Sequence, residues 1–346
     1  MRTGVLVIGG GQAGLAMGYH LAQRGIDHTI LDAGERIGGV WRGRWDSLTL
    51  FTPARYSALP GMDFPGDPEA YPGKNAVADY LEAYASRFSL PVRSGERAVS
   101  LRGEPGGYEV EVQQSGRRYE ARQIVVATGP FQHPFIPAIA QDLVPDVVQL
   151  HSSDYRGPAQ IPPGSVLVVG GGNSGVQIAE ELSRTHRVHL SVGTRMPRLP
   201  QRVLGRSVFW WLEGAGLLDV DVQSRLGRRM SRTETLIGSS PAGLRRHGVD
   251  VRGRMERASG VTASFADRQS VLVESVVWAT GFRPDYSWLD VPVLDPGGVP
   301  IHRRGISAVP GLHFLGLPWL HTRGSALIGW VGRDAAHLAD AVAGQC

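Results

Sequence analysis

The glycine pattern Gly-x-Gly-x-x-Gly occurs twice in this chain of 346 residues, each time directly after a short apolar run. The first copy runs from Gly9 to Gly14 and the second from Gly170 to Gly175. In such a loop the first glycine permits a tight turn, the second lets backbone approach a pyrophosphate, and the third lets the next helix pack on the strand. The start of that helix offers free N–H groups and a positive dipole end to phosphate. Each loop therefore predicts a dinucleotide site.

The surroundings of the two loops matter because glycine accounts for 46 of the 346 residues, so about one bare match is expected by chance. Helical periodicity follows both loops, over residues 13–22 and 176–182, and further strands are predicted at 28–31 and 188–192. These segments complete two β-α-β units; the alternative is a pair of tight turns that bind nothing. The loop residues predicted to contact dinucleotides are Gly9, Gly11, Gln12, Ala13 and Gly14 in the first copy, and Gly170, Gly172, Asn173, Ser174 and Gly175 in the second.

The residue expected to meet the ribose differs between the two units. Asp32 stands 23 residues after Gly9, followed by Ala33, and a carboxylate there accepts hydrogen bonds from ribose hydroxyls. The same count from Gly170 reaches Gly193, followed by Thr194 and Arg195. An arginine can pair with a 2′-phosphate, although an ordinary surface arginine is the alternative. We therefore predict FAD at the first loop and NADPH at the second, with Asp32, Ala33, Thr194 and Arg195 among the contacts.

Two short strands end in the same tripeptide, Ala-Thr-Gly, and these copies flank the second glycine loop. Thr128 and Gly129 belong to the first copy, and Ala279, Thr280 and Gly281 form the second. Small residues let a chain pass close beside a cofactor. The arrangement predicts an α/β fold of two Rossmann-like, three-layer dinucleotide-binding domains. A discontinuous FAD domain, 1–155 and 278–346, would enclose an inserted NADPH domain, 156–277.

Three other segments are candidates for the cofactor or substrate sites. Gly38 and Gly39 form a second glycine pair, followed by Val40 and Trp41. Backbone there could run along a flavin, with Trp41 as a wall. Residues 44–53 come next, with a packed loop as the alternative. A last helix is predicted to begin near Gly324 and Ser325. We expect a substrate pocket between the domains, near residues 45–60 and 315–325. Trp210 and Trp211 are interpreted as core or interface residues rather than pocket residues.

Composition excludes several other classes of protein. The single cysteine, Cys346, rules out an internal disulfide, a Cys-x-x-Cys pair and a thiolate zinc site, and we expect no metal. The net charge is +4 without a basic cluster interleaved with aromatics, so nucleic-acid binding is not expected. No apolar run reaches the roughly 18 residues that span a bilayer, and the first residues already form a strand. We expect a cytoplasmic protein without a membrane partner; a homodimer is compatible with this sequence.

Together these segments resemble the flavin-dependent monooxygenases with two dinucleotide-binding domains, and most closely their short bacterial branch. That family carries Phe-x-Gly-x-x-x-His-x-x-x-Tyr before the second loop. His151 and Tyr155 match it, while Pro145 and Val147 replace the Phe and Gly. Many members place an Asn beside the flavin, where this chain has Phe51.

The resemblance implies roles for several residues. Phe51 and its neighbour Thr52 would lie near the reacting part of the flavin, so they are catalytic candidates. His151 is a third candidate, interpreted as ordering the domain junction or nicotinamide side more than as a proton donor. Gly324 and Ser325 would direct a helix N-terminus at the flavin, where the dipole stabilises negative charge.

The resemblance also implies a reaction. NADPH would reduce FAD, reduced FAD and O₂ would form a C4a-(hydro)peroxyflavin, and this would oxygenate a small organic or heteroatom (N, S or As) substrate or a ketone. The flavin supplies the hard chemistry and the protein supplies orientation. A first alternative, favoured by the missing Asn and the half-matched motif, is an NAD(P)H-dependent flavin reductase without oxygen insertion. A second is a nucleotide-binding sensor without turnover.

Overall fold

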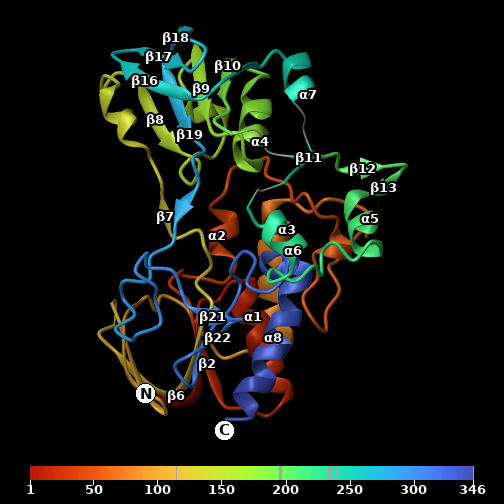
Figure 1. Ribbon diagram of the computed structural model, residues 1–346, viewed down its shortest axis with the longest axis vertical. Helices are drawn as coiled ribbons and strands as arrows, with labels where there is room; N and C mark the ends of the chain where they lie inside the picture. The colour runs from red at the N-terminus through yellow and green to blue at the C-terminus, as the bar shows by residue number, and fades with distance from the viewer. Residues whose placement is uncertain (114, 195–196, 233–234, 239–240, 346) are drawn as a thin grey trace.

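The computed structural model describes residues 1–113, 115–194, 197–232, 235–238 and 241–345. Two α/β bodies lie one above the other along the long axis, each built on its own parallel sheet (Figure 1). The chain passes from the lower body to the upper one and returns to the lower. The predicted mixed α/β class with two Rossmann-like sheets is confirmed.

The lower body contains a sheet of nine strands among the described residues. Its parallel centre has the order β23-β6-β1-β2-β3, so the strand that precedes the first glycine loop lies in the middle of the sheet. Strands β4 and β5 join through β6 as an antiparallel meander, and β21 and β22 extend the edge beside β23. The strands are β1 (Arg2–Ile8), β2 (His28–Leu31), β3 (Val92–Arg93), β4 (Ala98–Glu104), β5 (Gly107–Val112), β6 (Arg118–Val126), β21 (His302–Arg303), β22 (Ile306–Ser307) and β23 (Leu312–Phe314).

Helices cover one face of this sheet and the meander covers the other, which gives three layers. The predicted helix after the first loop is α1 (Gln12–Gln23); it packs against α8 (Ile328–Ala343), with α3 (Lys74–Arg87) beside them. The apolar faces of these helices and one face of β1 form a common core, and the other face of β1 packs toward the meander. The alternation follows from the period-two geometry of a strand buried on both faces.

The upper body holds five parallel strands in the order β15-β10-β9-β19-β8. Helices α4 (Asn173–Leu182) and α7 (Pro241–Arg246) lie on one face, and an antiparallel sheet of β16, β17 and β18 lies on the other. The strands are β8 (Val148–His151), β9 (Ser165–Val169), β10 (Arg187–Ser191), β15 (Asp250–Arg252), β16 (Met255–Ser259), β17 (Thr262–Phe265), β18 (Ser270–Leu272) and β19 (Ser275–Trp278).

The two connections between the bodies run side by side as an antiparallel pair, β7 (His133–Pro134) and β20 (Phe282–Arg283). The predicted boundary at residue 155 needs correction on this point. Strand β8 pairs with β19 in the upper sheet, because parallel pairing satisfies the edge of that sheet. The first crossing therefore lies near β7, before β8, and the second follows β19.

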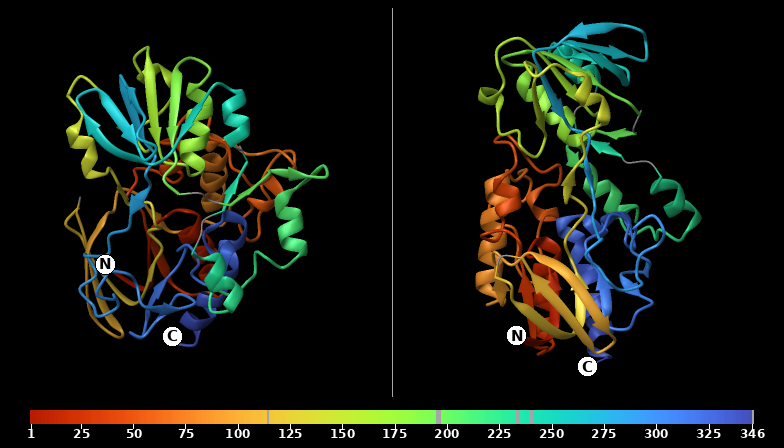
Figure 2. Two further views of the ribbon diagram at one scale, coloured as in Figure 1. Left: turned by 45° about the horizontal axis from the view of Figure 1, so that its top comes forward. Right: turned by 90° about the vertical axis from the view of Figure 1, so that its left-hand side faces the viewer.

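An arm, defined as residues 197–232, leaves the upper body and lies against the lower one (Figure 2). It carries the hairpin β12 (Arg202–Val203) and β13 (Arg206–Ser207) and the helices α5 (Val208–Gly214) and α6 (Arg225–Met230). At its start β11 (Arg198–Leu199) pairs with β14 (Leu236–Ile237). Phe209 is 1% exposed and packs against Trp330 of α8. Trp210 and Trp211 are 38% and 40% exposed, so they are not core residues; an interface role for them stays a prediction.

The remaining helices are short. They are α2 (Gly39–Arg42) and the 3₁₀ turns η1 (Ala54–Tyr56), η2 (Ala138–Asp142), η3 (Pro158–Gln160) and η4 (Arg323–Ala326). The last helix begins at Ile328 and not near Gly324, because Leu327 has an extended backbone (ψ 142°) that separates η4 from α8. No helix within the described ranges is long and apolar enough to cross a membrane.

Candidate functional site

The first glycine loop forms a cradle in which the first and last glycines have no space for a side chain, whereas the middle glycine faces open space. Gly9 has a φ of 115°, and a Cβ there would lie 2.4 Å from the carbonyl oxygen of Ala127. A Cβ at Gly14 would lie 1.8 Å from the carbonyl oxygen of Gly9, whereas one at Gly11 would meet nothing within 4 Å. The outer glycines are thus required by the fold, and the middle one leaves backbone N–H groups accessible. Gln12 and Ala13 begin α1 directly beside this opening.

Asp32 is fixed next to that cradle. Its Oδ2 atom accepts a hydrogen bond from the Gly10 N–H at 2.7 Å, and its Oδ1 atom accepts one from the Gly34 N–H at 2.8 Å. The carboxylate therefore lies at the carboxyl end of β2, beside the loop, as the residue count predicted. Two backbone bonds hold its orientation, so ribose hydroxyls could approach its remaining lone pairs without reorganising it. Ala33 follows and is exposed.

The second loop repeats the geometry of the first. Gly170 has a φ of 125°, and a Cβ there would lie 2.2 Å from the carbonyl oxygen of Ala279. A Cβ at Gly175 would lie 2.0 Å from the carbonyl oxygen of Gly170, and Gly172 again faces open space. In both bodies, then, the alanine of an Ala-Thr-Gly turn lies against the first glycine. Asn173 and Ser174 open α4, and Asn173 accepts a hydrogen bond from the N–H of Ile237 at 3.3 Å.

Beside the second loop the structure places an arginine that the residue count missed. Gly193 and Thr194 are exposed at the end of β10, while Arg195 lies outside the described residues. The Nε atom of Arg254 lies 3.3 Å from where a Cβ of Gly193 would be. Arg254 follows β15, the neighbour of β10 in the sheet, and is exposed. Arg254 is far from Gly193 in the sequence, and no sequence signal connected the two; only the pairing of β15 with β10 brings them together.

The remaining residues of the two Ala-Thr-Gly turns organise the crossings. The Thr128 hydroxyl accepts a hydrogen bond from Gln132 Nε2 at 3.0 Å, and Gln132 also donates to the Gly129 carbonyl at 2.9 Å. The Thr280 hydroxyl donates to the carbonyl of Phe135. Each turn is therefore bonded to residues of the first connection, near β7.

His151 lies buried, 1% exposed, at the end of β8. Its Nε2 atom lies 2.9 Å from the carbonyl oxygen of Gly281, which can only accept, so this nitrogen carries the proton. Its Nδ1 atom accepts from the N–H of Ser153 at 3.1 Å. Burial lowers the pKa of His151 below its usual value, so the ring is neutral near pH 7. Nε2 is thus bonded to the returning crossing, and Nδ1 to the loop that follows β8.

Phe51 and Thr52 lie where the lower body meets the arm. Thr52 is 6% exposed, and its hydroxyl forms a 2.9 Å hydrogen bond with the Ser57 hydroxyl. Phe51 is half-buried and stacks on Phe209, with ring centroids 6.0 Å apart. Phe51 thus contributes an apolar face and no hydrogen-bonding group, and the Thr52 hydroxyl is occupied within its own loop.

Trp41 is the only member of the Gly39–Trp41 set that packs inward: it contacts the cores of both bodies, whereas Val40 is 69% exposed. Sequence reasoning missed the residue that anchors the following segment. Lys74, 7% exposed at the start of α3, donates from Nζ to the Arg44 carbonyl and to Asp46 Oδ1, both at 2.6 Å. A buried lysine with two such acceptors fixes the 44–46 segment at the junction.

Gly324 and Ser325 are buried at the entrance to α8. The Ser325 hydroxyl oxygen accepts hydrogen bonds from the N–H groups of His321 and Thr322, at 3.1 and 2.9 Å. A Cβ at Gly324 would lie 2.8 Å from Trp330. The η4 turn is therefore rigid, and it leads into the helix that packs on α1.

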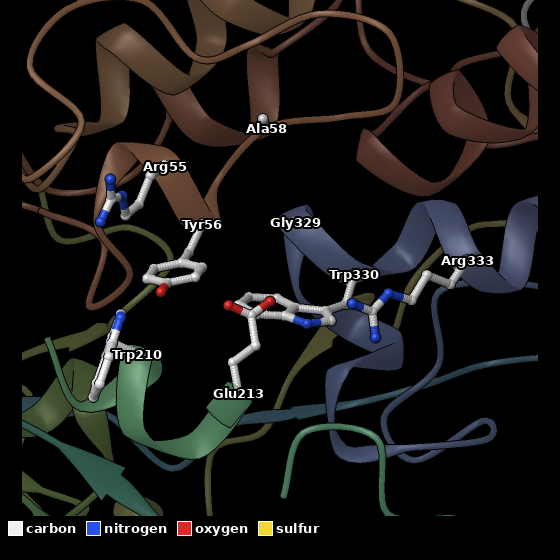
Figure 3. A pocket seen from close by; sticks show the side chains of 8 residues that line it. All are labelled: Arg55, Tyr56, Ala58, Trp210, Glu213, Gly329, Trp330 and Arg333. Carbon is white, nitrogen blue, oxygen red and sulfur yellow. The ribbon is translucent and has the colours of Figure 1, made fainter. Parts of the chain in front are cut away.

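A cavity of about 500 Å³ opens between η1, α5 and α8 (Figure 3). Tyr56 and Trp330 stack within it, with ring centroids 5.7 Å apart. The cavity includes residues of the 45–60 segment but none of 315–325; α8 and the arm supply the rest of its lining. A substrate pocket near both segments stays a prediction. The lining residues are Arg55, Tyr56, Ala58, Trp210, Glu213, Gly329, Trp330 and Arg333.

Charged groups stand at both ends of this cavity (Figure 3). Arg55 pairs with Glu69 at 3.0 Å, and Arg333 pairs with Asp219. Burial and the nearby Glu213 carboxylate raise the pKa of Tyr56, so its hydroxyl stays protonated. Phe209 connects the cavity to Phe51, since it stacks on Phe51 and also contacts Tyr56 and Trp330. An aromatic wall one side chain thick separates Phe51 from the cavity.

Comparisons with known proteins agree with this geometry. Residues 6–202 match the model of the pyridine nucleotide-disulphide oxidoreductase family. An "uncharacterized oxidoreductase CzcO-like" of Geobacillus kaustophilus is 50% identical over 337 residues, 96% of each chain. The probable indole-3-pyruvate monooxygenase YUCCA1 of Arabidopsis thaliana is 29% identical over 83% of this chain and 77% of that protein. A flavin-containing monooxygenase structure from Stenotrophomonas maltophilia is 30% identical, covers 100% of this chain and 99% of its own, and has a TM-score of 0.82.

Proposed function

Because this chain belongs to the pyridine nucleotide-disulphide oxidoreductase family and, within it, to the flavin monooxygenases, we propose that it reduces FAD with NADPH and uses O₂ to oxygenate a small molecule. FAD and NADPH are the cofactors of these enzymes. The observation that carries the assignment is the pair of open cradles with unequal ribose positions: Asp32 beside one, and Gly193 with Arg254 beside the other.

The first cradle fits FAD. Gly11 leaves room for a pyrophosphate, the start of α1 supplies N–H donors, and Asp32 presents a fixed carboxylate to ribose hydroxyls. A carboxylate there repels a 2′-phosphate, which favours a dinucleotide without one. When bound, the flavin supplies hydride acceptance and the reaction with oxygen.

The second cradle fits NADPH. Gly172 is open, and Asn173 and Ser174 begin α4 beside it. At the ribose position the chain has no carboxylate; Gly193 leaves space, and Arg254 brings a guanidinium within reach. Charge-assisted pairing of arginine with phosphate favours NADPH over NADH. Arg195, which the sequence places in the same loop, is proposed as a second contact.

The residues between the cradles are proposed to position the reactants and exclude water. His151 ties β8 to the returning crossing, and so fixes the nicotinamide side of the junction without taking a proton. Phe51 offers a dry aromatic face where many relatives carry an amide. We propose that the cavity behind Phe209 admits the substrate, because the stacked rings of Tyr56 and Trp330 suit a planar aromatic molecule. Indole-3-pyruvate, named for the YUCCA relatives, has such a ring.

Oxygen insertion is tested by product analysis under labelled oxygen. Flavin-loaded protein is given NADPH and a panel of sulfides, amines, ketones and aromatic 2-oxo acids, and oxygen uptake is measured with peroxide subtracted. A labelled product from any member supports the oxygenase. If NADPH bleaches the flavin but peroxide is the only oxygen product with every substrate, oxygenation is rejected.

A second candidate is an NAD(P)H-dependent flavin reductase without oxygen insertion. Phe51 supplies no hydrogen bond, and the Thr52 hydroxyl is already bonded to Ser57, so no polar group from this pair is available to the oxygen reaction. Rapid, NADPH-dependent reduction of a quinone under nitrogen, together with peroxide alone in air, would favour this reading. A protein that binds FAD and is not bleached by NADPH would instead support the sensor.

A further inference from the structure

Three apolar side chains near the β12–β13 hairpin of the arm are exposed to solvent. Leu204, at the tip of the β12–β13 hairpin, is 86% exposed, and Trp210 and Trp211 of α5 are 38% and 40% exposed. We call these three residues the apolar knob. The Trp211 Nε1 donates to the Val203 carbonyl at 3.1 Å, and the two indoles contact edge to face, so the knob is one continuous structure. Single exposed apolar residues are ordinary, but a cluster marks a contact site.

The backbone at the tip shows that the fold does not need this leucine. The hairpin turn consists of Leu204 and Gly205, with φ values of 49° and 75°. Such turns normally use Asn or Gly, because other L-residues are strained at positive φ. With most of its surface in solvent, Leu204 has no packing that compensates for the strain. A strained, exposed apolar residue points to a role outside the folded core.

The groups around the knob are mainly positive. Arg206 lies over the Trp210 ring at 4.4 Å, and Arg202 is exposed and shares Glu69 with Arg55 at 3.3 Å. The arm then continues into α6, which exposes further arginines. The acidic residue of α5, Glu213, lines the cavity at the other end of the helix. The exposed α6 arginines are Arg225, Arg228 and Arg229.

The positive charge and small area of the apolar knob indicate which kind of partner it binds. In a two-fold dimer through the knob, the arginines of one copy would face the same arginines of the other and repel them. The area that three apolar side chains can bury is also below the roughly 800 Å² per partner of a stable interface. An anionic lipid surface fits better: tryptophan and leucine settle at the head-group level, and arginines pair with lipid phosphates. The hairpin also points away from the rest of the molecule (Figure 1), so it can reach a flat surface.

We propose that the apolar knob docks this protein reversibly on anionic bilayers, with Leu204 inserted and Arg202 and Arg206 at the phosphates. This contact is peripheral, so it differs from the sequence expectation, which weighed only spanning segments. Trp210 also lines the cavity of Figure 3. Docking through the knob therefore brings that cavity to the lipid surface, where amphiphilic small molecules concentrate.

Vesicle flotation tests the proposal without any activity readout, so its failure is independent of the proposed oxygenation. Full-length, flavin-loaded protein is mixed with vesicles of phosphatidylcholine and phosphatidylglycerol in equal parts, or of phosphatidylcholine alone. We expect flotation with the anionic vesicles at low salt, less at high salt, and none with the neutral ones. Leu204→Asn should weaken partitioning about tenfold and Arg206→Gln about fivefold.

The variants are chosen so that folding cannot explain the result. Asn is favoured at positive φ, so Leu204→Asn should keep or raise the thermal midpoint. The matched control is Leu272→Asn, another exposed leucine (64%) on β18 of the upper body, which should float like the parent. Three outcomes overturn the proposal: no flotation of the parent protein, equal flotation of Leu204→Asn, or concentration-dependent dimers that Leu204→Asn abolishes while vesicles bind nothing.

Discussion

The Nε2 atom of His151, at the end of β8, donates a hydrogen bond to the carbonyl oxygen of Gly281, at the start of the returning crossing, at 2.9 Å. Because Nδ1 accepts from Ser153, the imidazole has no free nitrogen with which to exchange a proton. The ring holds the end of β8 against the turn after β19. A histidine used this way is a positioning residue.

Replacing His151 by Gln should therefore slow NADPH-dependent bleaching of the flavin without altering its pH profile. Burial lowers the pKa of His151, so the parent ring is already neutral above its ordinary pKa and no titration is lost. We expect a higher KM for NADPH and an unchanged flavin content, measured by stopped-flow absorbance from pH 6 to 9. Loss of an ionisation from the profile would show that His151 transfers a proton.

Matched alanine substitutions at the open glycines should separate the two cofactors. At Gly11 and Gly172 a Cβ meets no neighbour within 4 Å, so both variants should fold. Each methyl group would occupy the space proposed for a pyrophosphate. Gly11→Ala should be purified largely without FAD, and Gly172→Ala should retain FAD but raise the KM for NADPH by roughly tenfold or more. Full flavin content in Gly11→Ala would contradict the assignment of the first cradle.

Arg254→Ala should raise the KM for NADPH about tenfold, the value expected for loss of a charge-assisted hydrogen bond, and change that for NADH little. Arg195→Ala should behave alike if both contact the 2′-phosphate. Arg257→Ala, an exposed arginine on β16, serves as the control for net charge. The measurement is steady-state kinetics with both nucleotides. An equal rise in the KM values for NADH and NADPH would exclude a phosphate contact.

His313 should make the protein less stable in mild acid. It is 1% exposed on β23, and burial lowers its pKa to about 4. The unfolded chain, with an ordinary histidine pKa of 6.5, binds this proton more readily. Stability is therefore unaffected above pH 6.5 and falls as the pH drops toward 4, by roughly 2 kcal/mol at pH 5.

The measurement compares urea unfolding of the parent and His313→Asn at pH 7.5 and pH 5. The variant is expected to be less stable at neutral pH, because its site is a buried one, but its loss between the two pH values should be smaller by about 2 kcal/mol. Other buried histidines are present in both proteins, so the difference isolates His313. Parallel pH dependences would mean that His313 is protonated in the folded state.

Local sequence patterns predicted the parts of this fold that are determined by residues close together in the sequence. The run from Gly9 to Gly14 and the periodicity behind it gave the position of α1, and Asp32 lies beside the cradle because a β-α-β unit of fixed length brings it there. The last helix begins a few residues later than the sequence predicts, because the extended backbone of Leu327 leaves no signal in hydropathy.

Features that depend on tertiary pairing could not be predicted in this way. Nothing in the sequence of β8 indicates which sheet it joins; only its pairing with β19 places it in the upper body. Arg254 reaches Gly193 because β15 and β10 are neighbours. Tryptophan is a typical core residue, which favoured burial of Trp210 and Trp211. In the structure α5 buries Phe209 against Trp330, and the two indoles are left partly exposed.

The pairing of β6 with β23 bears on how the chain is made. During synthesis the first residues emerge long before β23 and α8, which complete the edge of the lower sheet and cover α1. The upper body has all of its strands once β19 has emerged. The body that is translated first is therefore the last to be completed, and until then α1 lacks its packing against α8.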